Sequence, residues 1–306
     1  MRRAFAFTAA LCCAGMMFAS SAGAGQGDKS YVSDRGGKLR ALIYHETTGF
    51  RHASIPYAIR QLELWGKAND IEMTANRTSS RFTDRQLARY DVVIWLSTVG
   101  GVRGDAPLLT PDEWAAFERY MERGGGYAGI HAGSDCCDES AWYGELLGNQ
   151  ARFDSHPGGV GGSPGCIGSR PRDPDVLGQT GSCFQAVVTT EDNRHPSTAH
   201  LPDRWPIADE LYNFKGNPRS TVHVLQTLDE SSYDFQPHPF IRDWGNLMGN
   251  DHPITWCQLY DGGRVWYTGL GHDANIYAEH DSMSMIVRGI QWAAGKGRAG
   301  VCRDEG

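Results

Sequence analysis

The chain has 306 residues, of which 40% are hydrophobic and 21% charged, and its formal net charge is −7. This length suits one large α/β domain or two small ones. No basic run or basic–aromatic stripe appears, and no apolar stretch is long enough to span a membrane. We therefore expect neither nucleic acid nor a membrane among the partners of this protein.

The first 24 residues have the pattern of a secretory signal peptide. Arg2 and Arg3 precede an apolar stretch over residues 4–18, and Ala22-Gly23-Ala24 forms a small-x-small cleavage site. We expect a secreted or periplasmic protein whose net charge is about −9, because the signal removes two arginines and no acid. Residues 25–37 are polar and contain glycine, which is typical of a linker.

Strand and helix patterns alternate from residue 38 onward. Short, largely apolar stretches predict strands over residues 39–44, 71–75, 91–97 and 127–130. Ser54 is the expected cap of one intervening helix, and Thr83 and Thr110 open capping boxes for two others. Such alternation predicts an α/β fold with an open parallel sheet and helices on both faces.

The second half of the chain is richer in strands. A short helix over residues 142–147 is followed by a Gly/Pro/Ser-rich stretch, residues 158–182, which we interpret as an inserted loop. The remaining pattern predicts strands over 184–190, 221–228, 254–260 and 265–269, a hairpin turn at 261–263 and a last helix over 282–294. The expected α/β domain covers residues 38–296, and residues 297–306 form a C-terminal tail.

Six cysteines remain once the signal is removed, and export makes disulfides possible. Their connectivity is not readable from sequence. We favour a Cys166–Cys183 pair, because these residues bracket a Gly/Pro-rich stretch. Cys257 lies in an apolar strand pattern and is expected to be a free thiol in the core.

Two motifs are misleading. Residues 124–129 spell G-x-G-x-x-G, but they follow a predicted helix and precede a strand, the reverse of a dinucleotide-binding turn. Residues 161–165 spell G-x-S-x-G without the strand and helix that a nucleophile elbow requires. We therefore expect no nucleotide cofactor.

His131 occupies the most informative position in the sequence. It directly follows the predicted strand 127–130, and ligands of open α/β sheets bind beyond the carboxyl ends of strands. Ala132 and Gly133 leave room around the imidazole. The structural alternative is a histidine that caps the strand and bonds the backbone.

Other polar side chains also follow predicted strands. His45, Glu46 and His52 follow the first strand, Asp135 lies in the turn after the fourth, and His272 and Asp273 follow the last. Two or three imidazoles with a carboxylate suit a divalent metal such as zinc, and the candidate ligands are His45, His52, His131 and His272. Alternatively, His131 or His272 acts as a metal-free general base.

For several histidines, a purely structural role is the alternative to a functional one. His52 would help to cap the helix that follows it. His156, His195 and His252 are each followed by proline and are expected in structural turns.

With these elements placed, the chain resembles the ThuA-like family, named after a trehalose-utilisation protein. The resemblance rests on ordered segments at residues 48–55, 124–135, 142–148, 153–157, 191–196, 209–214, 251–256, 261–264 and 269–272. It implies a flavodoxin-like fold close to the class I glutamine amidotransferases. Those enzymes carry a nucleophilic cysteine in a Gly-Ile-Cys-x-Gly turn, whereas this chain has His131 in that place, and Cys136 and Cys137 do not restore it.

The resemblance also implies carbohydrate metabolism. We expect a hydrolase or lyase acting on a small glycoside or keto-sugar, with His131, Asp135 and His272 as catalytic residues. The candidate substrate-binding residues are Glu46, Arg51, Trp142, Tyr143, Tyr212 and Asp273. The alternative is a non-catalytic sugar-binding module that uses exposed aromatics, and a weaker one is an amidohydrolase, against which the missing cysteine argues.

Overall fold

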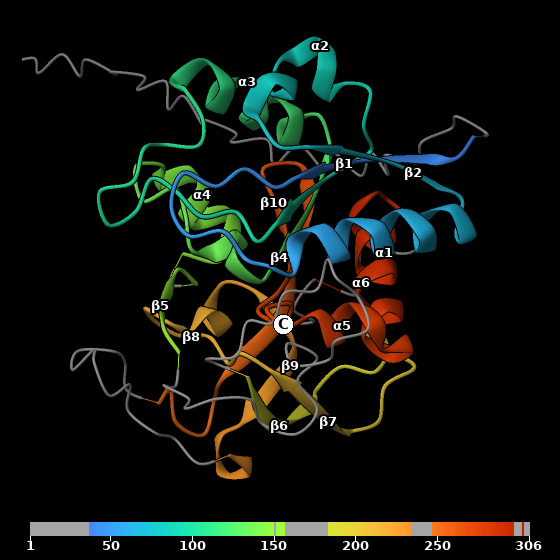
Figure 1. The fold of residues 1–306 in the computed structure, drawn as a ribbon, viewed down its shortest axis with the longest axis vertical. Helices are drawn as coiled ribbons and strands as arrows, with labels where there is room; N and C mark the ends of the chain where they lie inside the picture. Colours follow the sequence, from blue (N-terminus) through green and yellow to red (C-terminus); the bar gives the residue numbers. More distant parts are fainter. Residues whose placement is uncertain (1–36, 150, 157–182, 234–246, 297–301, 303–306) are drawn as a thin grey trace, which may run out of the picture. The chain divides into compact units, whose positions relative to one another are not determined.

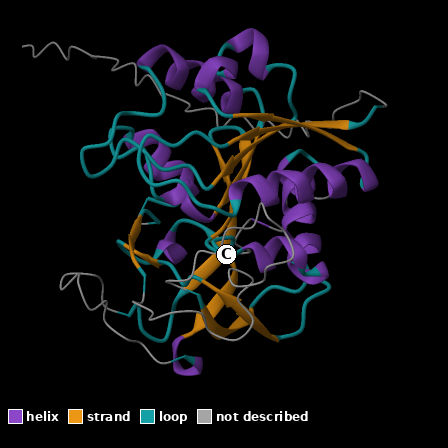
Figure 2. Ribbon diagram, viewed as in Figure 1, coloured by secondary structure: helices purple, strands orange, loops and turns teal. Residues whose placement is uncertain are grey.

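A computed structural model describes residues 37–149, 151–156, 183–233, 247–296 and 302. Nine strands form one sheet in the order β2-β1-β3-β4-β11-β10-β9-β6-β7 (Figures 1 and 2). Their bounds are β1 Leu39–Tyr44, β2 Ile71–Asn76, β3 Val92–Leu96, β4 Gly126–Ile130, β6 Phe184–Thr190, β7 Arg204–Asp209, β9 His223–Asp229, β10 Pro253–Tyr260 and β11 Gly263–Thr268. A second sheet pairs β5 (Phe153–Ser155) with β8 (Asn213–Phe214).

Five strands of the large sheet are parallel. β2, β1, β3, β4 and β11 run in one direction, in the order that characterises flavodoxin-like sheets. The strands β3 and β4 are buried along their whole length. Burial on both faces is the reason that these strands are continuous apolar runs rather than alternating ones, so their positions were readable from sequence.

The remaining strands extend the sheet in antiparallel fashion. β10 pairs with β11 across a tight turn in which Asp261 and Gly262 have φ angles of 50° and 85°, and β9, β6 and β7 follow. The expected α/β class with additional C-terminal strands is therefore confirmed. β7 was not predicted, because Pro206 interrupts its pattern; a proline is tolerated there because β7 is the edge strand.

Helices cover both faces of the sheet. α1, α5 and α6 pack together on one face, and α2, α3 and α4 lie on the other (Figure 1). Their bounds are α1 Ile55–Ala68, α2 Asp84–Leu87, α3 Pro111–Glu122, α4 Ala141–Leu147, α5 Ala274–Ala278 and α6 His280–Ala293. None of the described helices is long and apolar enough to cross a membrane.

The helix caps differ in how well they were predicted. Thr110 and Glu113 form both hydrogen bonds of a capping box, and the Thr83 hydroxyl accepts from the backbone N–H of Gln86. Ser54 occupies the N-cap position of α1 as expected, but its buried side chain makes no capping hydrogen bond. α1 instead begins with Pro56 in its first turn, which fixes the backbone without a side-chain cap.

The expected free thiol at Cys257 was also wrong, because Cys257 forms a disulfide with Cys302. Strand β10 therefore holds the segment that follows α6. Cys183 is disulfide-bonded as well, but Cys166 lies outside the described residues, so their pairing stays a prediction. The expected signal peptide, the linker up to residue 36, the inserted loop 158–182 and the tail other than Cys302 also lie outside them.

Gly289 lets α6 approach the sheet closely. A Cβ atom at this position would lie 2.4 Å from the ring of Trp266 on β11, which is fully buried. We expect Gly289→Ala to lower the free energy of unfolding by about 1–3 kcal/mol, the usual cost of overpacking a core. Urea denaturation would measure this change.

Gly144 in α4 provides the matched control. A Cβ atom there would meet only ordinary contacts, 3.5 Å from Arg152. Gly144→Ala should therefore be neutral or stabilising, because alanine has the higher helix propensity. Equal destabilisation by the two substitutions would contradict the role assigned to Gly289.

Candidate metal-binding and catalytic site

Four buried side chains bring their polar atoms together: His52, His131, Glu210 and His272, called here the His/Glu cluster. The Nε2 atom of His131 lies 3.1 Å from Nε2 of His52, 3.3 Å from Nδ1 of His272 and 3.3 Å from Oε2 of Glu210. Glu210 Oε2 is also 3.0 Å from Nδ1 of His272. The three histidines follow β1, β4 and β11, so they gather where the parallel strands end.

Glu210 reaches the cluster from the far edge of the sheet. It directly follows β7, and the preceding carboxylate, Asp209, accepts hydrogen bonds from the backbone N–H groups of Gly271 and Asp273 at 2.6 and 2.7 Å. These bonds tie the end of β7 to the loop after β11. Glu210 was missed because β7 was missed; its only sequence signal was the acidic pair in the segment 209–214 that contributed to the family resemblance.

His131 has a strained backbone and a fixed ring. Its φ angle is +51°, a region that residues other than glycine adopt rarely, and such strain gathers at functional sites. Its Nδ1 lies 2.9 Å from the carbonyl oxygen of Gly269, which only accepts, so Nδ1 carries a proton and donates it. In the neutral ring the lone pair is then on Nε2, which faces the cluster. The expected backbone bond and the expected site contact therefore both occur, on different nitrogens.

Burial keeps two of the cluster histidines neutral. Burial lowers the pKa of His52 well below its usual range, and the nearby imidazoles of His131 and His272 lower it further. Burial also lowers the pKa of His131, although Glu210 opposes the shift. These two rings therefore present lone pairs rather than charges.

Glu210 and His272 behave in the opposite way. Burial raises the pKa of Glu210, but His272, His131 and His156 outweigh it and hold the pKa well below its usual range. Burial lowers the pKa of His272, but the carboxylates of Glu210, Asp209 and Asp273 outweigh it and raise the pKa. Glu210 is thus an anion, and His272 is the ring that most readily takes a proton.

The donor set and its spacing fit a divalent metal ion. Zinc binds histidine nitrogens and carboxylate oxygens at about 2.0–2.2 Å in a tetrahedron, whose ligand atoms are then roughly 3.3–3.5 Å apart. Four of the six distances among the cluster atoms lie between 3.0 and 3.3 Å, and all six are within 4.8 Å. If the proton of neutral His52 is on Nδ1, which has no hydrogen-bond partner among the described residues, His52 presents a second Nε2 lone pair to such a cation.

Aromatic rings and a fourth histidine surround the cluster. The ring of Tyr212 packs against His131 with centroids 4.1 Å apart. Phe50, which is 57% exposed, packs edge-on against His52 at 4.9 Å. Nε2 of His156 lies 3.5 Å from Oε1 of Glu210, so this histidine does more than form a turn. Sequence reasoning did not single out Phe50.

Other candidate residues do not join the cluster. His45 contacts the guanidinium of Arg51 instead, at 3.3 Å from Nδ1. Glu46 accepts a hydrogen bond from Tyr44. Asp135 lies in the turn after His131, but its carboxylate is held by Arg103 in a bidentate pair at 2.7 and 2.9 Å.

Three further candidate site residues make hydrogen bonds within the fold and do not reach the cluster. Asp273 caps α5 by accepting from the backbone N–H of Asn275. Tyr143 is buried and donates to the carbonyl oxygen of Gly133, beneath the His131 turn. Trp142 donates to Asp261, which lies in the hairpin at the opposite end of β11 from the cluster.

His195 and His252 have the structural settings expected of them. Nδ1 of His195 is 2.7 Å from the hydroxyl of Ser197. His252 bridges Glu230 and the carbonyl oxygen of Tyr212, each at 2.8 Å. His252 thus holds the segment that carries Tyr212.

Comparisons with known proteins place the chain in a family. The family model ThuA, described as trehalose utilisation, matches residues 40–293. A ThuA-like protein from Bacteroides uniformis ATCC 8492 is 22% identical with a TM-score of 0.61, over 87% of this chain and 95% of that one. A ThuA-like protein from Parabacteroides merdae ATCC 43184 is 17% identical with a TM-score of 0.57, over 84% and 90%.

A third solved structure, PurLQS from Thermotoga maritima, is 16% identical with a TM-score of 0.45, over 83% of this chain and 99% of that one. No curated protein matches the chain. At these identities the two ThuA-like structures establish the fold alone.

Proposed function

The chain belongs to the ThuA family, and from this membership and the His/Glu cluster we propose that it is an exported enzyme that cleaves a small glycoside or keto-sugar. The reaction is a hydrolysis or an elimination. One observation carries the proposal: three buried imidazoles and a carboxylate direct their polar atoms at one point. The signal-peptide pattern of residues 1–24 supports export.

We assign a divalent metal, of which zinc is the first candidate, to His52, His131, Glu210 and His272. Such an ion would polarise a substrate oxygen and lower the pKa of water if it accepted a fifth ligand beside these four side chains. The usual glycosidase pair of two free carboxylates is poorly supported here. Asp209, the carboxylate next to Glu210 in the chain, is occupied by two backbone N–H groups.

The protein's own groups supply proton transfer and substrate contacts. In the metal-free alternative, His272 has a raised pKa and lies against Glu210, which suits it to hold or release a proton during bond cleavage. His156 contacts the far oxygen of Glu210 and is less buried than the cluster residues, so it is placed on the side from which substrate would arrive. The exposed ring of Phe50 offers an apolar surface for a sugar ring beside His52.

A non-catalytic sugar-binding module is the second candidate, and the structure favours it less. It would need exposed aromatic rings beside the site, but Tyr143 is buried beneath the turn and Trp142 contacts the distant hairpin. Only Phe50 meets the requirement among the described residues that contact the cluster. An amidohydrolase of the cysteine type lacks its nucleophile, because His131 stands in its place.

Metal analysis combined with an activity assay tests the proposal. The mature protein should contain about one divalent ion per chain and should release sugar from trehalose or from 3-keto-glucosides. Removal of the ion by a chelator should abolish turnover, and zinc or another divalent ion should restore it.

Two results would contradict parts of the proposal. Full activity after complete metal removal would leave an acid–base mechanism by His131 and His272, whose pH profile would follow a histidine ionisation. Binding of these sugars without any turnover would support the binding module instead.

A further inference from the structure

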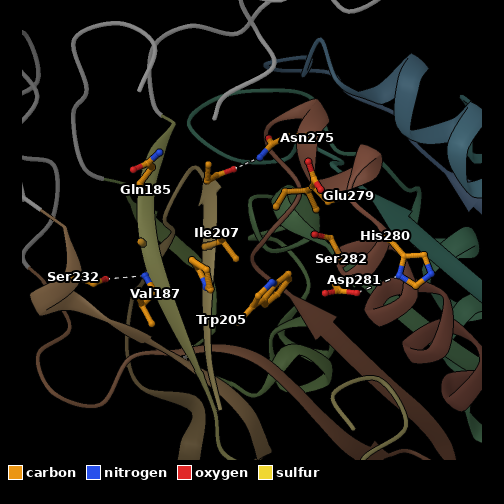
Figure 3. A pocket seen from close by; sticks show the side chains of 14 residues that line it. Gln185, Val187, Trp205, Ile207, Ser232, Asn275, Glu279, His280, Asp281 and Ser282 are labelled. Carbon is orange, nitrogen blue, oxygen red and sulfur yellow. Dashed lines mark hydrogen bonds and ion pairs between the residues drawn. The ribbon is translucent and has the colours of Figure 1, made fainter. Parts of the chain in front are cut away.

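A groove lies between the edge of the sheet and the helices α5 and α6, away from the side chains of the His/Glu cluster. Its volume is about 600 Å³. Figure 3 shows Trp205 and Ile207 of β7 between Val187 on one wall and Asn275 and Glu279 on the other. The groove is therefore built from ordered elements on both sides.

The floor of the groove is apolar because alternate side chains of β7 lie on the same face of the sheet. Trp205 and Ile207 are two residues apart on β7, so their side chains lie on the same face of the sheet. Each is buried except for 8% of its surface. The small exposed part of Trp205, beside a branched aliphatic side chain, offers an apolar contact for the C–H groups of a sugar ring.

One wall carries an acceptor that lacks a partner. Asn275 is only 5% exposed, and its side-chain amide donates to the carbonyl oxygen of Ala208 at 2.6 Å. Its Oδ1 atom has no hydrogen-bond partner within the described part of the chain. Buried polar atoms are nearly always paired, so an unpaired acceptor in a groove wall points to a ligand that donates a hydrogen bond.

The rim of the groove adds two carboxylates and no strong cation. Glu279 and Asp281 line it, and neither lysine nor arginine is among the described lining residues. His280, the one basic side chain there, is 79% exposed and contacts Asp281. Hydroxyl groups would find acceptors here, whereas a phosphate or carboxylate ligand would be repelled.

The groove shares its framework with the cluster. The strand face that carries Trp205 and Ile207 continues to Asp209, and Glu210 follows directly. On the other wall, α5 begins just after Asp273, next to His272. Asp209 joins the two walls through its bonds to Gly271 and Asp273.

We propose that this groove is a second binding site of the protein and that it takes a neutral saccharide. The inference rests on the proposed carbohydrate function and names a site for sugar outside the reacting centre. Trp205 supports a ring, and Asn275, Glu279 and Asp281 accept hydrogen bonds from its hydroxyls.

Calorimetric titration with trehalose and with maltotriose tests the groove. The double variant Glu279→Gln/Asp281→Asn should bind at least one of them about 5-fold more weakly than the wild type, because charged acceptors make the stronger hydrogen bonds. Both side chains are exposed, so the variant should fold normally. Trp205→Phe should weaken binding further by shrinking the platform.

The matched control changes two exposed carboxylates of α3, on the other face of the sheet: Asp112→Asn/Glu122→Gln. It should bind like the wild type. Titrations in a His131→Asn background should still show groove binding, because the cluster is separate.

The outcomes separate the two proposals. If the groove variants bind saccharide like the wild type while His131→Asn loses all binding, the groove proposal is overturned and the cluster proposal stands. The same holds if the groove binds a cation such as spermidine instead of a saccharide. If the wild type binds neither saccharide yet turns over a glycoside, the groove proposal is again overturned. If saccharide binding depends on the groove but no glycoside is turned over, the catalytic proposal fails and the groove proposal stands.

Discussion

Replacing His131 is expected to weaken metal binding by at least about 100-fold. Loss of a residue that merely supports a metal ligand typically costs 10–100-fold in affinity, and loss of a ligand should cost no less. His131 Nε2 lies within 3.3 Å of a polar atom of each of the three other cluster residues. Its loss therefore removes the ligand that is central to the proposed metal site. Metal content and calorimetric titration of the purified protein would measure the effect.

The choice of substitution matters because His131 has a positive φ angle. His131→Ala places an ordinary residue in a strained conformation, whereas asparagine tolerates it better and can still donate to the carbonyl oxygen of Gly269. His131→Asn should therefore keep the fold, judged by circular dichroism, and still lose the metal.

His195→Asn is the matched control, because His195 is also fully buried but lies outside the cluster, and the two sulfur atoms near it, those of Cys257 and Cys302, are joined in a disulfide and so cannot act as thiolate ligands. It should change stability without changing metal content. If His131→Asn binds one ion with wild-type affinity, His131 is not a ligand.

Loss of the Cys257–Cys302 disulfide is expected to have the largest effect on stability. The bond closes a loop with a sequence separation of 45 residues, and constraining the unfolded chain over this length contributes about 4 kcal/mol in the chain-entropy model. We expect the Cys257→Ala/Cys302→Ala variant to lose stability of about this size. Urea denaturation at a fixed temperature would measure it.

A double-mutant cycle distinguishes the bond from the side chains. Each single substitution already breaks the disulfide, so each should cost nearly as much as the double variant. If the effects of Cys257→Ala and Cys302→Ala simply add, the loss comes from side-chain packing and not from the covalent link.

The candidate site shows where sequence reasoning succeeds. His52, His131 and His272 were readable because each follows a strand of the parallel half, and the carboxyl ends of parallel strands share one edge. Those strands were readable in turn because burial on both faces makes them uninterrupted apolar runs.

The same reasoning could not decide which of two candidate residues in one segment of the chain reaches the site. His45 and His52 both follow β1, but only His52 joins the cluster, because His45 contacts Arg51. Trp142 and Tyr143 stand side by side in α4, but one contacts the hairpin turn and the other lies beneath the His131 turn. The direction of a side chain depends on how its element packs, which a single sequence does not encode locally.

By itself, then, the sequence determined the parallel core, its covering helices other than α5, the hairpin between β10 and β11, and three of the four cluster residues. Local hydrophobic period and turn chemistry specify these features, because both act over a few residues. Only the tertiary structure decided that Glu210 completes the cluster and that Cys257 pairs with Cys302. Both depend on contacts between segments far apart in the chain, and the first requires an edge strand whose end is tied by Asp209 to the loop that carries His272.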